Sequence, residues 1–155
     1  SVIIGLALKL NNYGESISLE HDITYANITS ENMGINELEM KSVVKHSPLI
    51  EYDNLEQKWK WYDISELKFS NKIDMLIVDG PPRITQELAR YPAIPILHEY
   101  FSDRFTILLD DSKRDDEAII IQKWIVFLET NKYKVKIENF INYEKGMSIL
   151  QVYRC

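Results

Sequence analysis

Two long apolar runs dominate the pattern of hydrophobic and polar positions along the chain. The stretches IDMLIVD (73–79) and RFTILLD (104–110) carry hydrophobic side chains at nearly every position and end on an aspartate. Runs of this length and composition are typical of parallel strands that are covered on both faces of a sheet. We therefore expect both stretches to be central strands.

The rest of the pattern alternates between helical and extended spacing. Further strands are expected over 16–20, 40–46, 133–140 and 147–153, and helices over 2–12, 22–33, 92–100 and 113–130. Residues 49–63 predict a hairpin or an irregular excursion around an Asp53–Asn54 turn. The connection 141–146 is too short for a parallel crossover, so the last two strands should pair antiparallel.

This order of elements predicts an α/β fold. We expect an open, Rossmann-like sheet that is mostly parallel, has helices on both faces and ends in a C-terminal antiparallel hairpin. The helix over 113–130 should bury a stripe formed by Ile120, Ile121, Trp124 and Leu128.

Composition narrows the class of protein. The 155 residues are 45% hydrophobic and 27% charged, which suits a single folded domain over 1–155. Asp and Glu (24) outnumber Lys and Arg (18) and no basic run is present, so we expect no nucleic-acid partner. No apolar run approaches the roughly 20 residues of a membrane span. The single cysteine, Cys155, excludes an internal disulfide and fits a cytoplasmic location.

Polar side chains follow four of the expected strands. Glu20, His46, Asp79 and Asp110 each stand where a strand ends. Ligands of open α/β sheets bind beyond the carboxyl ends of the strands. The sequence therefore predicts a site along this edge of the sheet.

Polar residues at two of these strand ends could bind a nucleoside. Glu20 could accept both hydroxyls of a ribose, or it could be a solvated loop acid that shares a helix-capping role with Asp22. Ser47 could bond an adenine edge, although a plain turn before Pro48 explains the same residues.

Three aspartates could converge at the other two ends. Asp79, Asp110 and Asp111 together would need a cation or a protonated member, because neighbouring carboxylates repel each other. A hard divalent ion such as Mg²⁺ or Ca²⁺ suits oxygen ligands. Alternatively, Asp111 or Ser112 simply caps the helix over 113–130.

Other polar and aromatic candidates favour structural roles. His98 lies inside a short expected helix and is better explained by packing than by base catalysis. Trp59 and Trp61 favour a local core, although Trp61 and Tyr62 could wall a flat ligand.

Four ordered segments carry a resemblance to a known family. ISLEHD, IDMLIVDGPP, RYPAIPIL and ILLDDSKRDDEAIIIQKW occur in this order along the chain. The set resembles the class I S-adenosylmethionine-dependent methyltransferases. It is similar above all to the small-molecule O-methyltransferases related to the catechol type, including those attached to bacterial and viral glycan-synthesis proteins.

The resemblance implies roles for the cofactor side of the site. Glu20 matches the acid that holds the ribose of S-adenosylmethionine, and His21 would lie beside it. Ser47 falls in the loop that usually touches adenine. Asp79 matches the acid near the transferred methyl group, where it would be a catalytic and cofactor-binding residue.

The resemblance also implies roles for the acceptor side. In the metal-dependent branch Asp79 is a ligand, and Asp110 and Asp111 match the other two. The second of these is commonly Asn, so an Asp here departs from the pattern. Arg90 and Tyr91 look like a subgroup signature near the acceptor pocket.

The implied activity is transfer of a methyl group to a hydroxyl of a small molecule or of a sugar in a glycan. The family's first strand and glycine-rich turn, which would precede Ser1, have no counterpart here. The alternative is therefore a non-catalytic methyltransferase-like module or fragment of a larger multidomain protein. A dehydrogenase is disfavoured because no GxGxxG occurs.

Overall fold

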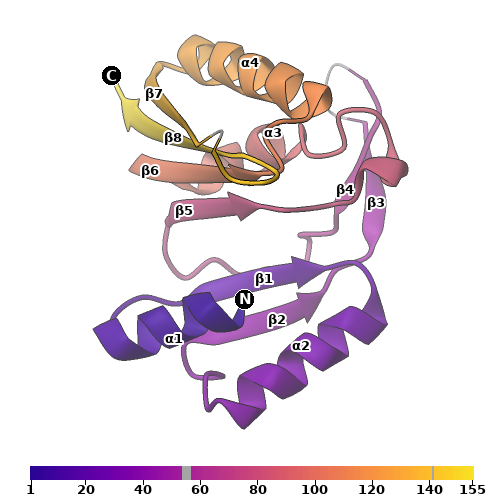
Figure 1. Cartoon of the computed structure of the whole chain (residues 1–155), viewed down its shortest axis with the longest axis vertical. Helices are drawn as coiled ribbons and strands as arrows, with labels where there is room; N and C mark the ends of the chain where they lie inside the picture. The colour runs from indigo at the N-terminus through magenta and orange to yellow at the C-terminus, as the bar shows by residue number, and fades with distance from the viewer. Residues whose placement is uncertain (54–56, 141) are drawn as a thin grey trace. The chain divides into compact units, whose positions relative to one another are not determined.

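The structure is a computed structural model that describes residues 1–53, 57–140 and 142–155. The elements follow in the order α1 (Val2–Asn11), β1 (Ser16–Glu20), α2 (Ile23–Ile35), β2 (Ser42–His46), β3 (Leu49–Tyr52), β4 (Trp59–Tyr62), β5 (Ile73–Val78), η1 (Arg83–Thr85), α3 (Ala93–Leu97), η2 (His98–Tyr100), β6 (Phe101–Asp110), α4 (Asp115–Thr130), β7 (Tyr133–Phe140) and β8 (Met147–Arg154) (Figure 1). No helix in these ranges is long and apolar enough to cross a membrane.

The chain divides into two compact units. Ser1–Ile50 and Tyr62–Glu66 form unit 1, and Glu51–Trp61 and Leu67–Cys155 form unit 2. Each unit is described by itself.

Unit 1 is built on a pair of parallel strands. β1 and β2 pair in register from Ser16↔Ser42 to Glu20↔His46, so both strands end at the same edge. The carboxylate of Asp22 accepts hydrogen bonds from the backbone N–H groups of Thr24 (2.7 Å) and Tyr25 (3.4 Å). These bonds satisfy two of the free donors at the start of α2 and confirm Asp22 as its N-cap.

Unit 2 contains a four-stranded mixed sheet in the order β5-β6-β8-β7. β5 and β6 are parallel, whereas β8 is antiparallel to both β6 and β7. The expected α/β fold with a C-terminal antiparallel hairpin is therefore confirmed.

Helix α4 closes the core of unit 2. Its predicted stripe is confirmed, since the four side chains are at most 5% exposed: Ile120, Ile121, Trp124 and Leu128. The indole Nε1–H of Trp124 donates to the carbonyl oxygen of Tyr91 at 2.8 Å. This bond satisfies the one polar group that Trp124 brings into the core.

Strand β5 differs from its prediction. It lies at one end of its four-stranded sheet, and Met75 and Ile77 are 53% and 40% exposed. The prediction that β5 is a central strand covered on both faces is therefore wrong for the described residues. The apolar run is present, but no described strand pairs with its second edge.

The structure also tests two local predictions, the hairpin over 49–63 and the cap of the helix over 113–130. β3 and β4 pair with each other, as expected of a hairpin over 49–63, while Asn54 of the expected turn lies outside the described residues. Helix α4 begins at Asp115, and its N-cap position is Arg114 without a side-chain capping bond. Capping of this helix by Asp111 or Ser112 was therefore wrong.

The exposure difference between neighbouring strands can be tested with matched substitutions. Ile107→Ala in β6 removes a side chain that is 0% exposed, so it should lower the free energy of unfolding by about 2–5 kcal/mol. Ile77→Ala in β5 should cost less than half as much, because Ile77 is already 40% exposed. Urea denaturation followed by circular dichroism measures both. Equal losses would show that β5 is covered in solution.

Candidate functional site

Three carboxylates meet where β5 and β6 end. The parallel register places Val78 of β5 opposite Leu109 of β6. Asp79 and Asp110, the next residues along the chain, therefore stand at neighbouring strand ends. Together with Asp111 they offer one oxygen each within 4.8 Å of one another. The expected convergence of these aspartates is therefore present.

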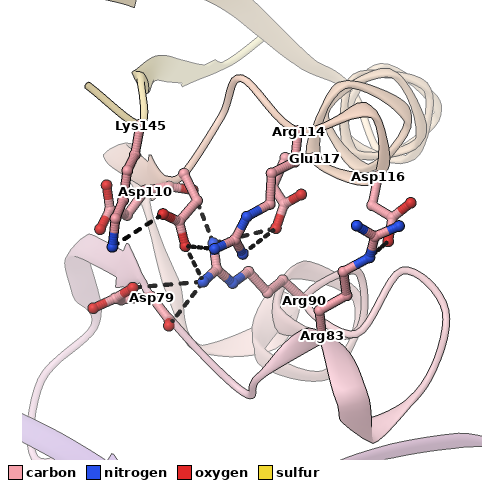
Figure 2. A network of polar contacts seen from close by, with 9 residues as sticks. Asp79, Arg83, Arg90, Asp110, Arg114, Asp116, Glu117 and Lys145 are labelled. Carbon is pink, nitrogen blue, oxygen red and sulfur yellow. Dashed lines mark hydrogen bonds and ion pairs between the residues drawn. The ribbon is translucent and has the colours of Figure 1, made fainter. Parts of the chain in front are cut away.

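One arginine side chain forms hydrogen bonds to both strand ends. The guanidinium of Arg90 donates to the backbone oxygens of Asp110 (2.8 Å) and Asp79 (3.0 Å) (Figure 2). It also donates to Oδ2 of Asp111 at 3.0 Å and lies 3.3 Å from Oε1 of Glu117. The rigid fork of donors of a guanidinium suits such a set of planar acceptors.

The network continues into the first turn of α4. Arg114 contacts Oδ2 of Asp111 at 2.8 Å and Oε1 of Glu117 at 3.6 Å. The side chains of Arg90, Asp111 and Glu117 are only 4–6% exposed. Buried charges are costly unless they are paired, and here two guanidiniums pair two buried carboxylates.

Burial and neighbouring charges raise the pKa of two acids at this site. Burial raises the pKa of Asp79 above its ordinary value, and the neighbouring Asp110 carboxylate adds to the increase. Solvent moderates this effect, since the side chain of Asp79 is 70% exposed. Burial also raises the pKa of Glu117, although the nearby Arg90 opposes the change. Both acids therefore hold a proton more readily than a free carboxyl group.

Asp111 has two features that favour a ligand. Its Oδ1 atom is buried and has no hydrogen-bond partner among the described residues, although its Oδ2 is paired with two arginines. Its backbone has φ 56°, a left-handed conformation that only a small share of non-glycine residues adopts. Such strained positions cluster at functional sites.

Unit 1 holds the other group of predicted site residues. Oε1 of Glu20 accepts the backbone N–H of Asp22 at 3.1 Å and lies 3.0 Å from Nδ1 of His21, without hydrogen-bond alignment. Nε2 of His46 lies 3.2 Å from the carbonyl oxygen of His21. Both contacts of Glu20 involve Oε1, so Oε2 is the oxygen that could accept a bond from a ligand.

Ser47 is held by the backbone around it. Its hydroxyl donates to the carbonyl oxygen of Asp63 at 2.7 Å, and its N–H donates to that of Glu20 at 2.8 Å. The residue is 3% exposed. These bonds fit the turn interpretation, and an adenine contact by Ser47 stays a prediction.

Arg90 and Tyr91 are both buried in unit 2, at 4% and 8% exposure. The ring of Tyr91 packs against Trp59 at 4.9 Å between ring centroids, and Nζ of Lys123 lies 5.2 Å from its centre. A substrate could reach these side chains only if such contacts opened, so their acceptor-binding role stays a prediction.

The sequence reasoning missed Glu117 and Arg114. Asp115, Asp116 and Glu117 share the first turn of α4, where acids are favoured by the helix dipole. The helical spacing nevertheless indicated that Glu117 is buried, because Glu117 precedes Ile121 by one turn and continues the buried stripe. A carboxylate on a buried stripe predicts a buried partner.

Comparison with known proteins supports the fold. Neither the protein-family models nor the curated proteins contain a match. Solved structures that match include an O-methyltransferase from Bacillus cereus in complex with SAH, with a TM-score of 0.61 and 14% identity. Another is the O-methyltransferase TomG from Streptomyces achromogenes in complex with SAM, with a TM-score of 0.60 and 9% identity. An rRNA methylase from Streptococcus thermophilus matches with a TM-score of 0.57 and 10% identity.

The alignments cover 91%, 90% and 90% of this chain, and 63%, 62% and 73% of the three structures. The chain thus spans under two thirds of the length of the two O-methyltransferases. It has the Rossmann-like α/β fold of S-adenosylmethionine-dependent methyltransferases, which confirms the resemblance read from the sequence at the level of the fold.

The Arg90 network should dominate the stability of unit 2. Arg90→Met leaves two buried carboxylates with one guanidinium, so it should lower the free energy of unfolding by about 3–5 kcal/mol. The control is Arg83→Met, because Arg83 is 66% exposed in its 3.0 Å ion pair with Asp116. It should cost less than about 1 kcal/mol. Chemical denaturation measures both, and similar costs would contradict the importance of Arg90.

The raised pKa of Glu117 predicts a pH-dependent contribution to stability. Because the folded protein holds this proton more tightly than the unfolded chain, the contribution is full below the ordinary value of 4.5. It is lost as the pH rises through the raised folded pKa. The stability of the unsubstituted protein minus that of Glu117→Gln should therefore fall with pH above 4.5 and then level off. Denaturation at a series of pH values measures this difference, and an increase with pH would reverse the assigned shift.

Proposed function

We propose that this protein is an S-adenosylmethionine-dependent O-methyltransferase that acts on a hydroxyl of a small molecule or sugar, including a glycan. The observation that carries the proposal is the convergence of Asp79, Asp110 and Asp111 at the carboxyl ends of parallel strands in a methyltransferase fold. Ligands of open α/β sheets bind at such strand ends.

The proposed cofactor contacts lie at the ends of β1 and β2. Glu20 would accept the ribose hydroxyls through Oε2, with His21 beside it and Ser47 near the adenine. The parallel register that places Glu20 opposite His46 brings two polar side chains to the same end of the strand pair, which supports this assignment. Asp79 would lie near the transferred methyl group.

Bound S-adenosylmethionine supplies a methyl group on a positively charged sulfur. Held by Glu20, His21, Ser47 and Asp79, the cofactor would give this methyl group to the acceptor oxygen. The new carbon–oxygen bond would form as the carbon–sulfur bond breaks, which would leave a neutral thioether. Without a metal ion, Asp79 or a neighbour would take the hydroxyl proton, and the raised pKa of Asp79 favours this role. The protein would contribute mainly by holding donor and acceptor in line.

A divalent cation, Mg²⁺ or Ca²⁺, is a further part of the proposal. Asp79, Asp110 and Asp111 supply only oxygen atoms, and within the described ranges the buried Oδ1 of Asp111 has no hydrogen-bond partner. Both features fit a hard cation. Such an ion, when bound, lowers the pKa of an acceptor hydroxyl and orients it.

The charge of the chain supports a small acceptor over RNA. The formal net charge is −6, and binding to a phosphate backbone relies on clustered Lys and Arg.

Arg90 and Tyr91 stay the proposed acceptor-side residues. We further propose that residues 1–155 act as one methyltransferase-like domain in the cytoplasm.

Binding of S-adenosylmethionine tests the cofactor assignment. Glu20→Ala should weaken binding at least about tenfold, since it removes the acceptor of two hydroxyl bonds. Glu39→Ala, an exposed acid of the same unit, should leave the affinity unchanged. Isothermal titration measures all three affinities. Equal affinity of Glu20→Ala and the unsubstituted protein would reject the ribose contact. No binding by any of the three would favour the non-catalytic module.

Removal of divalent cations tests the metal assignment. Methyl transfer to a hydroxyl acceptor panel should stop in excess EDTA and return when Mg²⁺ is added beyond the chelator. Radioactive methyl incorporation measures turnover. Full turnover in EDTA would reject the cation while leaving the cofactor assignment standing, and labelling of RNA in preference to small hydroxyl compounds would overturn the acceptor class.

A further inference from the structure

A lysine from another part of unit 2 reaches the aspartate cluster. Nζ of Lys145, in the connection between β7 and β8, lies 3.9 Å from Oδ1 of Asp111 (Figure 2). This is the buried oxygen that has no hydrogen-bond partner among the described residues. The distance is that of a loose ion pair rather than of a hydrogen bond.

Two backbone hydrogen bonds hold residues 145 and 146 beside the cluster. The N–H of Lys113 donates to the carbonyl oxygen of Lys145 at 3.1 Å, and that of Ser112 donates to Gly146 at 3.3 Å. Gly146 has φ +72°, and a Cβ atom there would lie 2.8 Å from Cγ of Lys113. A glycine is therefore required for the close approach that places Lys145 beside Asp111.

The charges around the cluster are not balanced. The cluster and the adjoining network contain the carboxylates of Asp79, Asp110, Asp111 and Glu117 and the two guanidiniums of Arg90 and Arg114. Two formal negative charges remain. The ammonium of Lys145 neutralises one of them, whereas a divalent cation would neutralise both.

Arg90 and Lys145 differ in how easily their charged groups can leave the aspartate cluster. Arg90 is only 5% exposed and its guanidinium also holds two backbone oxygens, so it is a permanent counterion. The side chain of Lys145 is 68% exposed. Its ammonium can return to water at little cost, because it was never fully desolvated.

We propose that the ammonium of Lys145 competes with a divalent cation for the Asp79–Asp110–Asp111 cluster, so that cation binding displaces the lysine. Lys145 thereby sets the cation affinity of the site. This inference rests on the cation that belongs to the proposed function. It makes Lys145 a positioning residue that acts through Asp111.

Binding of Mn²⁺, a spectroscopic substitute for Mg²⁺, tests the competition in the full chain without any turnover. Lys145→Met should bind Mn²⁺ at least about fivefold more tightly than the unsubstituted protein, because a positive charge about 4 Å away is removed. Lys145→Arg keeps the charge and should not gain affinity. Electron paramagnetic resonance of free Mn²⁺ gives the dissociation constants.

Lys113→Met is the matched charge control. Nζ of Lys113 donates to the carbonyl oxygen of Glu144 at 3.2 Å, outside the aspartate cluster. At about 0.15 M salt its removal should change the affinity less than about twofold, because screening weakens distant charges.

Equal Mn²⁺ affinity of Lys145→Met and the unsubstituted protein would overturn the competition but leave the cation site intact. Similar gains in Lys145→Met and Lys113→Met would also overturn it, in favour of a general charge effect. No Mn²⁺ binding by any variant would overturn both the competition and the cation, while titration with S-adenosylmethionine still decides the cofactor assignment separately.

Discussion

The buried guanidinium of Arg90 is the interaction on which the candidate site depends. It joins the backbone ends of β5 and β6 through the carbonyl oxygens of Asp79 and Asp110, and it pairs with Asp111 and Glu117. One side chain thereby fixes two strand ends and the first turn of α4. The same contacts offset the cost of burying two carboxylates, which would otherwise be prohibitive.

This arrangement separates fixed charges from exchangeable ones. The side chain of Arg90 is buried and its donors are directed at acceptors within the fold. Its positive charge therefore stays beside the buried carboxylate of Asp111. Asp79 faces outward at 70% exposure. The exposed ammonium of Lys145 approaches Oδ1 of Asp111, which has no hydrogen-bond partner in the described part of the chain. A site with a rigid inner side and an adjustable outer side is suited to bind a small charged ligand without losing its shape.

Much of the fold of unit 2 could be predicted because its signals are local. The stripe of α4, the short connection between β7 and β8, and the apolar run of β5 each follow from spacing and composition within one segment. The exposure of β5 could not be predicted, because the same apolar run suits a central strand and an end strand alike. Only the set of strands that pair with it decides which of the two it becomes.

For the site, the sequence by itself determined which acids stand at strand ends, since a strand and the residue that follows it are read from one stretch of chain. Asp79 and Asp110 were found in this way. Only the tertiary structure decided their counterions. Arg90 and Lys145 come from two other segments of the chain, and their charges meet at Asp111 because packing brings those segments together. Electrostatic partners act through space, so no spacing along the chain could reveal them.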